Sequence, residues 1–113
     1  MDKKEKLQWE IAEAVATFAK YNIPITPKSV SVGIHPYCVV ATLRDIVAPA
    51  EKNYAEDEKS RKLLEEFYAN IFNASKKILQ VEVENILGQL IRNSILWIDV
   101  EVGDGVIMFT FEG

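Results

Sequence analysis

The chain has 113 residues, of which 49% are hydrophobic and 27% charged, and its formal net charge is −4. That length suits a single domain with one core, and a net negative chain has no long-range attraction for phosphate groups, which argues against nucleic acid as a partner. No apolar stretch approaches the roughly 18 residues of a membrane span and no secretory signal opens the chain, so we expect a cytoplasmic protein without direct membrane insertion.

The first predicted element is an amphipathic helix over residues 3–21. Proline lacks the amide donor that a helix interior needs, so Pro24 and Pro27 end it. The residues that define its apolar face recur at helical spacing: Leu7, Ile11, Ala14, Val15 and Phe18.

A β-hairpin is predicted next. Val30, Val32 and Ile34 alternate with small or polar residues, the pattern of a strand over residues 29–34 with one buried face. His35 and a proline interrupt this pattern, and residues 37–43 resume it as a second strand.

A long helical region follows, after a short helix start at Pro49. Apolar residues keep a helical spacing from Glu58 to Leu87. A continuous helix of that length would span roughly 45 Å, about twice a seven-residue strand, so it must project past the sheet or bend. We place any break at residues 70–75, which contain the weakest helix formers, and the helix end at Gly88.

The last quarter of the chain predicts a second hairpin. Apolar residues alternate over 96–102, residues 103–105 give a turn signal, and residues 106–111 form the closing strand. The predicted fold is therefore α+β, a two-layer sandwich in the order α-β-β-α-β-β. Its sheet is four-stranded and mainly antiparallel, and its central helix is long and liable to break.

Both faces of this sheet carry apolar residues, whereas a two-layer domain should leave one face polar. The first helix or a second subunit must then cover the extra face, and we predict a homodimer. The residues that we assign to this outward face are Cys38, Val40, Trp97, Ile107 and Phe109.

The sequence offers little catalytic chemistry. His35 is the only histidine and lies three residues before Cys38, and a metal site or a nucleophile–base pair needs more groups than these two. Asp99, Glu101 and Asp104 could bind a cation, yet they alternate with apolar residues as on a solvated strand. We predict no catalytic residue, no metal and no cofactor.

Several of these stretches resemble the MpsC-like family, which is named for a Na⁺-translocating system that generates a membrane potential. The Pro49-to-Lys52 segment, which follows a hairpin, is the most specific part of the resemblance. The resemblance implies one MpsC-like domain over residues 1–113, an accessory role without established catalytic residues, and a membrane-system protein as partner. The other stretches that carry it are residues 27–30, 34–35, 39–43, 46–48, 61, 63–64, 88 and 103–109.

This chain departs from the family pattern at two turn positions. Ala48 stands where relatives often have threonine, so the hydroxyl half of a capping box is lost. Asp45 stands where glycine is usual, which makes the geometry of that turn a point to check.

Three functions remain open. The first is a non-catalytic interaction protein that docks through an apolar sheet face or the long helix. The second is a small-ligand sensor with a pocket between helix and sheet, for which His35, Trp97 and Arg44 are the candidate binding residues. The third is a hydrolytic or metal-dependent enzyme that uses His35 and nearby carboxylates. Convergent polar groups in an enclosed pocket would favour the sensor, and a flat self-associating apolar patch would favour the interaction protein.

Overall fold

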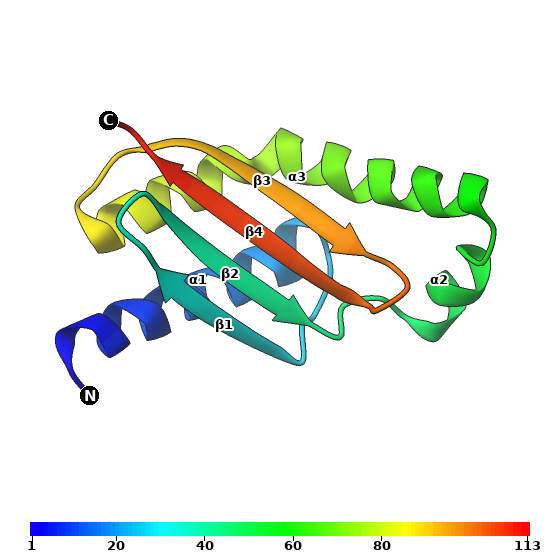
Figure 1. Cartoon of the computed structure of the whole chain (residues 1–113), viewed down its shortest axis with the longest axis horizontal. Coiled ribbons are helices and arrows are strands. Elements are labelled where there is room, and N and C mark those ends of the chain that lie inside the picture. Colours follow the sequence, from blue (N-terminus) through cyan, green and yellow to red (C-terminus); the bar gives the residue numbers. More distant parts are fainter.

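A four-stranded antiparallel sheet packs against two long helices in the computed structural model, which describes residues 1–113 (Figure 1). The spatial order of the strands is β1-β2-β4-β3, and each strand is antiparallel to its neighbours. This confirms the predicted α+β fold and its element order. The elements are α1 (Lys3–Asn22), β1 (Ser29–Ile34), β2 (Cys38–Arg44), α2 (Pro49–Tyr54), α3 (Glu58–Leu87), β3 (Ile91–Asp99) and β4 (Asp104–Phe111).

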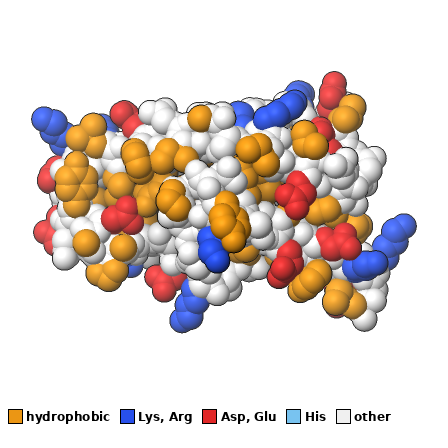
Figure 2. All heavy atoms as spheres, turned by 180° about the vertical axis from the view of Figure 1, so that it is seen from behind, with side chains coloured by type: hydrophobic (Ala, Val, Ile, Leu, Met, Phe, Trp, Pro, Cys, Tyr) orange, Lys and Arg blue, Asp and Glu red, His pale blue; other side chains and the backbone are white.

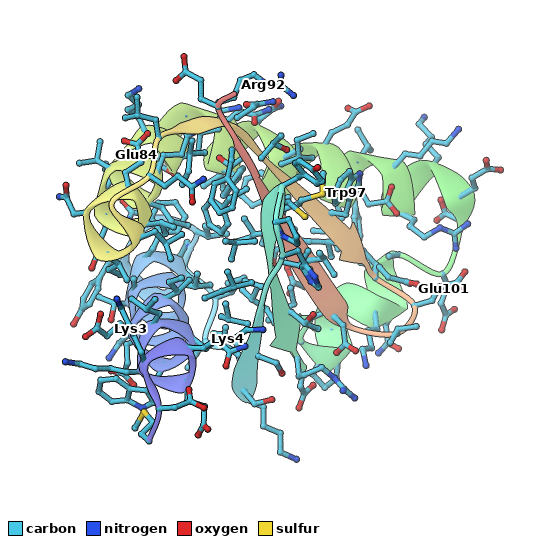
Figure 3. The ribbon with its side chains drawn as sticks, turned by 60° about the vertical axis from the view of Figure 1, so that its left-hand side comes forward. Lys3, Lys4, Glu84, Arg92, Trp97 and Glu101 are labelled. Atoms are coloured by element: carbon cyan, nitrogen blue, oxygen red, sulfur yellow. The ribbon has the colours of Figure 1, made fainter.

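Both long helices lie on the same face of the sheet, and Figure 2 shows the molecule from that side, where apolar and charged side chains are interspersed. Helix α1 contacts α3 and β1, and α3 contacts β3. Figure 3 shows α1 and the C-terminal end of α3 together on one side of the strands. Between the two helices, the rings of Phe18 and Phe72 meet edge to face, with their centroids 6.0 Å apart. We call the helix-covered surface the inner face of the sheet and the opposite surface the outer face.

The core lies between this inner face and the helices. Alternation along each strand directs every second side chain inward, and burial of those apolar groups is the main favourable contribution to folding. The central strands β2 and β4 supply the inner-face residues Val39, Ala41, Leu43, Ile107, Phe109 and Phe111.

The assignment of Ile107 and Phe109 to the outward face was wrong. Both are fully buried against the helices, and the outward residues of β4 are Val106 and Met108. Because both faces of β4 are apolar, alternation separates the two sets of residues without showing which set faces the helices. The first helix covers no part of the outer face.

Helix α3 is continuous, so the break considered at residues 70–75 does not occur. The hydroxyl of Ser75 donates to the Ile71 carbonyl at 2.9 Å, so this polar side chain is hydrogen-bonded within the helix and does not interrupt it. Asp57 caps the start by accepting the Ser60 amide at 2.8 Å, and Gly88 ends the helix with a φ of 67°. The first turns of α3 run past the sheet, beside α2 (Figure 1).

The second hairpin turns earlier than the sequence predicted. Strand β3 already begins at Ile91 and ends at Asp99, and Asp104 opens β4, so the turn comprises residues 100–103. Val100 is buried, but Val102 is 61% exposed and does not extend the inner stripe. The reversal places Gly103 at a φ of 90°, which glycine adopts without steric cost.

Candidate functional site

The outer face carries an apolar centre. Val40 of β2 pairs with Met108 of β4, and Met108 pairs with Ile95 of β3, so three side chains form one row across the sheet. The next row ends at Trp97, whose surface is 51% exposed. An uncovered apolar face of this kind is a feature of interaction sites. The apolar residues of the outer face are Cys38, Val40, Ile95, Trp97, Val106 and Met108.

His35 lies at the end of the β1–β2 hairpin, and its ring lies over Gly33 at the margin of the outer face. A Cβ atom added to Gly33 would come within 3.0 Å of His35 Nε2. The His35 amide donates to the Cys38 carbonyl at 2.9 Å, which closes the turn. His35 therefore borders the apolar centre, where glycine leaves room for its ring.

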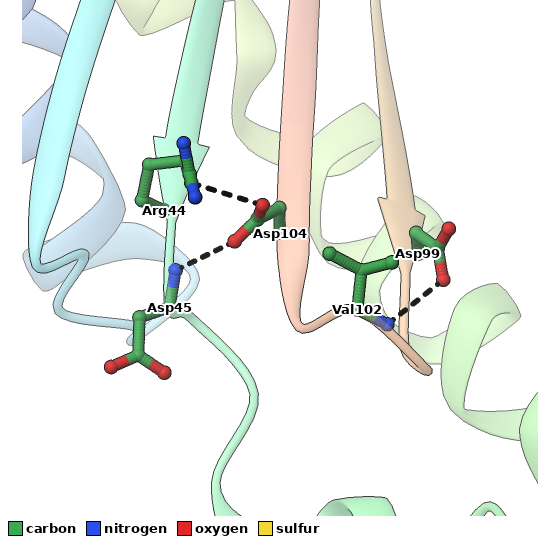
Figure 4. Close-up of polar contacts among 5 residues, drawn as sticks. All are labelled: Arg44, Asp45, Asp99, Val102 and Asp104. Atoms are coloured by element: carbon green, nitrogen blue, oxygen red, sulfur yellow. Dashed lines mark hydrogen bonds and ion pairs between the residues drawn. The ribbon is translucent and has the colours of Figure 1, made fainter.

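Arg44 lies at the other end of β2, in a network of polar contacts (Figure 4). Its Nε is 3.0 Å from Asp104 Oδ2, and the Asp45 amide donates to Asp104 Oδ1 at 2.9 Å. Asp45 has a φ of 57°, the left-handed conformation that glycine adopts most readily, so aspartate takes the glycine-type turn here. A polar depression of about 470 Å³ is lined by Lys28, Ser29, Arg44, Asp45, Val102 and Asp104.

The three candidate binding residues do not share one pocket. Arg44 lines the polar depression and Trp97 lines a separate groove beside α3, while His35 lines neither. His35 and Arg44 lie at opposite ends of β2, and Trp97 lies on β3, with β4 between it and β2. A ligand site between helix and sheet would require these side chains to converge, and they do not.

The carboxylates of the second hairpin also separate rather than converge. Asp99 Oδ1 accepts the Val102 amide at 3.2 Å, which stabilises the turn (Figure 4). Glu101 pairs with Arg61 of α3 at 2.8 Å, and Asp104 pairs with Arg44. Each carboxylate thus has its own structural partner.

The segment after the first hairpin forms a structural junction centred on Glu51. Glu51 Oε1 accepts the Ala48 amide at 3.1 Å, which is the half of a capping box that survives without a hydroxyl at position 48. Glu51 Oε2 accepts the Tyr68 hydroxyl at 2.6 Å and so joins α2 to α3. Burial and this hydrogen bond raise the pKa of Tyr68 above its usual value of 10.0.

Sequence reasoning missed Tyr68 because its partner lies 17 residues away in another helix. The only available signal was its position on the inner stripe of the long helix, four residues before Phe72. A polar-tipped aromatic at such a position usually needs a hydrogen-bond partner.

Comparison with known proteins identifies a family. A family model described as "Na+-translocating membrane potential-generating system (MpsC)" matches residues 3–113, nearly the whole chain. No curated protein and no solved structure matches. None of the helices combines the length and the apolar character that a membrane crossing requires.

Proposed function

The chain belongs to the MpsC family, and from this premise we propose that it is a non-catalytic accessory protein acting through protein–protein contacts. In this proposal it functions as a homodimer and assists a Na⁺-translocating system that generates a membrane potential, the system for which the family is named. The outer face of the sheet is its docking surface.

The observation that carries this proposal is the apolar centre of the outer face. Ile95 is 39% exposed and Trp97 51% exposed, because no helix of the same chain covers this face of the sheet. Leaving large apolar side chains in water forfeits roughly 1.5–3 kcal/mol each relative to burial. A partner that covers this face recovers that free energy.

The outer face is large enough to form the centre of a symmetric interface. Four strands about 4.8 Å apart and about 20 Å long present a flat area of roughly 400 Å². The smallest specific interfaces bury about 600 Å² per partner, so side-chain relief and the rim would have to contribute the rest. A twofold axis near Met108 would place the apolar centres against each other.

The rim of the outer face is polar. Arg44 and Asp104 lie at one end with opposite charges, and Thr110 and Asn93 lie at the other end without charge. A polar rim around an apolar centre is the usual anatomy of an interface. The polar side chains near this face are engaged in turns and ion pairs, which supports a structural rather than a catalytic role.

Sedimentation equilibrium at micromolar concentration tests the dimer. We expect the wild-type chain to have twice the monomer mass and Met108→Lys to have the monomer mass, because a buried lysine in the apolar centre has no partner. Ile78→Lys is the matched control: Ile78 is 60% exposed on α3, away from the sheet, so this variant should remain dimeric. A wild-type monomer, or a control that also dissociates, would contradict the proposal.

The link to a membrane system needs its own measurement. Membranes of the source cells can be incubated with the wild-type chain and with Ile78→Lys, washed, and assayed for bound protein before and after protease treatment of the membranes. We expect protease-sensitive binding of both. Binding that survives protease would indicate attachment to lipid and contradict a protein partner.

A second candidate function, a small-ligand sensor, is favoured by the polar depression at Arg44, which gathers two cations and two carboxylates. A screen of small anionic and zwitterionic metabolites by thermal shift, with Arg44→Ala as the control, tests it. A shift that depends on Arg44 would support the sensor. The absence of such a shift would leave the interaction proposal standing alone.

A further inference from the structure

A groove lies between α3 and the free edge of β3. It encloses about 250 Å³ and is lined by Glu65, Glu66, Ala69, Leu96, Trp97 and Ile98. Lys76 closes one end, because its Nζ donates to Asn93 Oδ1 at 2.9 Å and to the Ser94 carbonyl at 3.2 Å. At the other end Arg61 pairs with Glu101 across 2.8 Å. Between these two links, no side chain of α3 hydrogen-bonds to β3.

The backbone along this open stretch has unused hydrogen-bonding groups. Strand β3 is at the edge of the sheet and pairs only with β4. The carbonyl of Trp97 points toward β4, where it lies 3.3 Å from the position of a Cβ at Gly105. The carbonyl of Ser94 points the other way, to Lys76 of α3. Because backbone groups alternate in direction along an antiparallel strand, Leu96 and Ile98 direct their amides and carbonyls into the groove.

The groove also has an unbalanced charge. Glu65 and Glu66 are its only charged lining residues, and neither takes part in an ion pair. The lysine and the arginine that bound the groove already have partners in Asn93 and Glu101. The groove therefore offers apolar walls, two free carboxylates and a row of backbone donors and acceptors.

We propose that this groove binds a short, extended, basic segment of a partner protein, which adds a strand to the edge of β3. The backbone of the segment would pair with Leu96 and Ile98, and its lysine or arginine side chains would face Glu65 and Glu66. Strand addition obtains affinity from main-chain hydrogen bonds and specificity from alternate side chains. This site lies on the edge of the sheet and shares Trp97 with the outer face, but its backbone groups on Leu96 and Ile98 take no part in the dimer proposed there.

A second copy of this chain fits the groove less well than a foreign segment. Antiparallel pairing of two β3 strands about Leu96 would place Ile98 of one strand against Ser94 of the other, and the Ser94 carbonyl is already bonded to Lys76. The strand itself carries only Arg92 as a cation, four residues from Leu96. A separate basic segment can instead use the open positions without displacing Lys76.

The test uses the full chain and a fluorescent seven-residue peptide of alternating lysine and valine, with blocked ends. Fluorescence anisotropy gives its affinity, and NMR amide shifts locate its site. We expect saturable binding with the largest shifts at Leu96 and Ile98. Reversing both charges in Glu65→Lys/Glu66→Lys should weaken binding about tenfold, because attraction becomes repulsion at two positions and tenfold corresponds to about 1.4 kcal/mol.

Two controls separate strand addition from simple charge attraction. Glu10→Lys/Glu13→Lys makes the same charge change in a groove between α1 and α3 and should alter affinity less than twofold. A peptide of the same sequence in which every backbone amide is N-methylated has the same charge but no amide donors, and it should bind at least fivefold more weakly. Equal loss in both double variants, equal binding of the two peptides, or shifts centred on β1 or the outer face would each overturn the proposal.

Discussion

The two faces of the sheet are built from the same four strands, yet their apolar side chains are buried to different degrees. On the inner face, Ile107 and Phe109 have no exposed surface, and helices cover every central position. On the outer face, their chain neighbours Val106 and Met108 are only half-buried, and Trp97 is 51% exposed. Both sets are apolar, but burial is complete only under the helices.

This difference separates residues that stabilise the fold from residues that are available for contact. The free energy of folding comes from apolar surface removed from water, so the inner face supplies most of it within one chain. The outer face would gain full burial only against another molecule, such as the second copy proposed above. Substitutions at neighbouring positions of one strand should therefore have effects of different kinds.

The largest expected effect is at Phe109. We expect Phe109→Ala to lower the free energy of unfolding by about 3–5 kcal/mol, because it leaves a cavity under the helices. Met108→Ala should cost less, and its cost should grow with protein concentration, because association through the outer face stabilises the folded state by mass action. Urea denaturation at several protein concentrations measures both. If both variants lost the same free energy of unfolding, with the same dependence on protein concentration, the two faces would not differ in the way proposed here.

The contact between α2 and α3 lies past the end of the sheet, and a substitution at Tyr68 tests what holds these two helices together. Tyr68→Phe removes the hydrogen bond to Glu51, whose other oxygen keeps its bond to the Ala48 amide. We expect a loss of about 1.5 kcal/mol in urea denaturation, the low end for a bond to a charged group, because Glu51 is only half-buried. A loss below about 0.5 kcal/mol would show that apolar packing alone joins α2 to α3.

The stability difference between the wild type and Tyr68→Phe should depend on pH. The pKa of Tyr68 in the folded protein is raised above its usual value of 10.0, so the unfolded chain releases this proton first as the pH rises. The stability that Tyr68 contributes is fully present below pH 10 and declines above it, by up to about 1.4 kcal/mol per pH unit. Wild type and Tyr68→Phe should differ by a constant amount below about pH 9 and converge at higher pH.

Local patterns in the sequence were sufficient for most of the fold. Alternation at Val30, Val32 and Ile34 predicted the bounds of β1, and Gly88 marked the end of α3, because both signals depend on near neighbours alone. Of the two outcomes left open for α3, projection past the sheet or a break at residues 70–75, the helix takes the first for a related reason. Weak helix propensity in residues 70–75 is a local preference, and packing of Phe72 against Phe18 outweighs it.

The candidate site was predicted less well, because a site depends on distant residues that meet. The strand predicted over residues 37–43 already separates His35 from Arg44, but nothing local shows that Trp97 lies apart from both or that Glu51 meets Tyr68. Apolarity of the outer face was visible in the sequence, but which side of β4 faced outward was not. That choice is decided by the position of α1 and α3.

The smallest expected effect is at Ser94, a buried inner-face residue whose side-chain oxygen has no hydrogen-bond partner. Ser94 is 1% exposed, and its Oγ is buried opposite Phe109 in the register of β3 and β4. Burying an unpaired hydroxyl costs free energy, so Ser94→Ala should raise the free energy of unfolding by up to about 1 kcal/mol. Ser31→Ala, at an exposed position of β1, is the control and should change it by less than about 0.5 kcal/mol. Urea denaturation of both variants decides whether the inner face is a dry apolar layer. A loss of stability in Ser94→Ala would mean that the hydroxyl has a partner, such as an ordered water, and that the two faces differ less in polarity than their burial indicates.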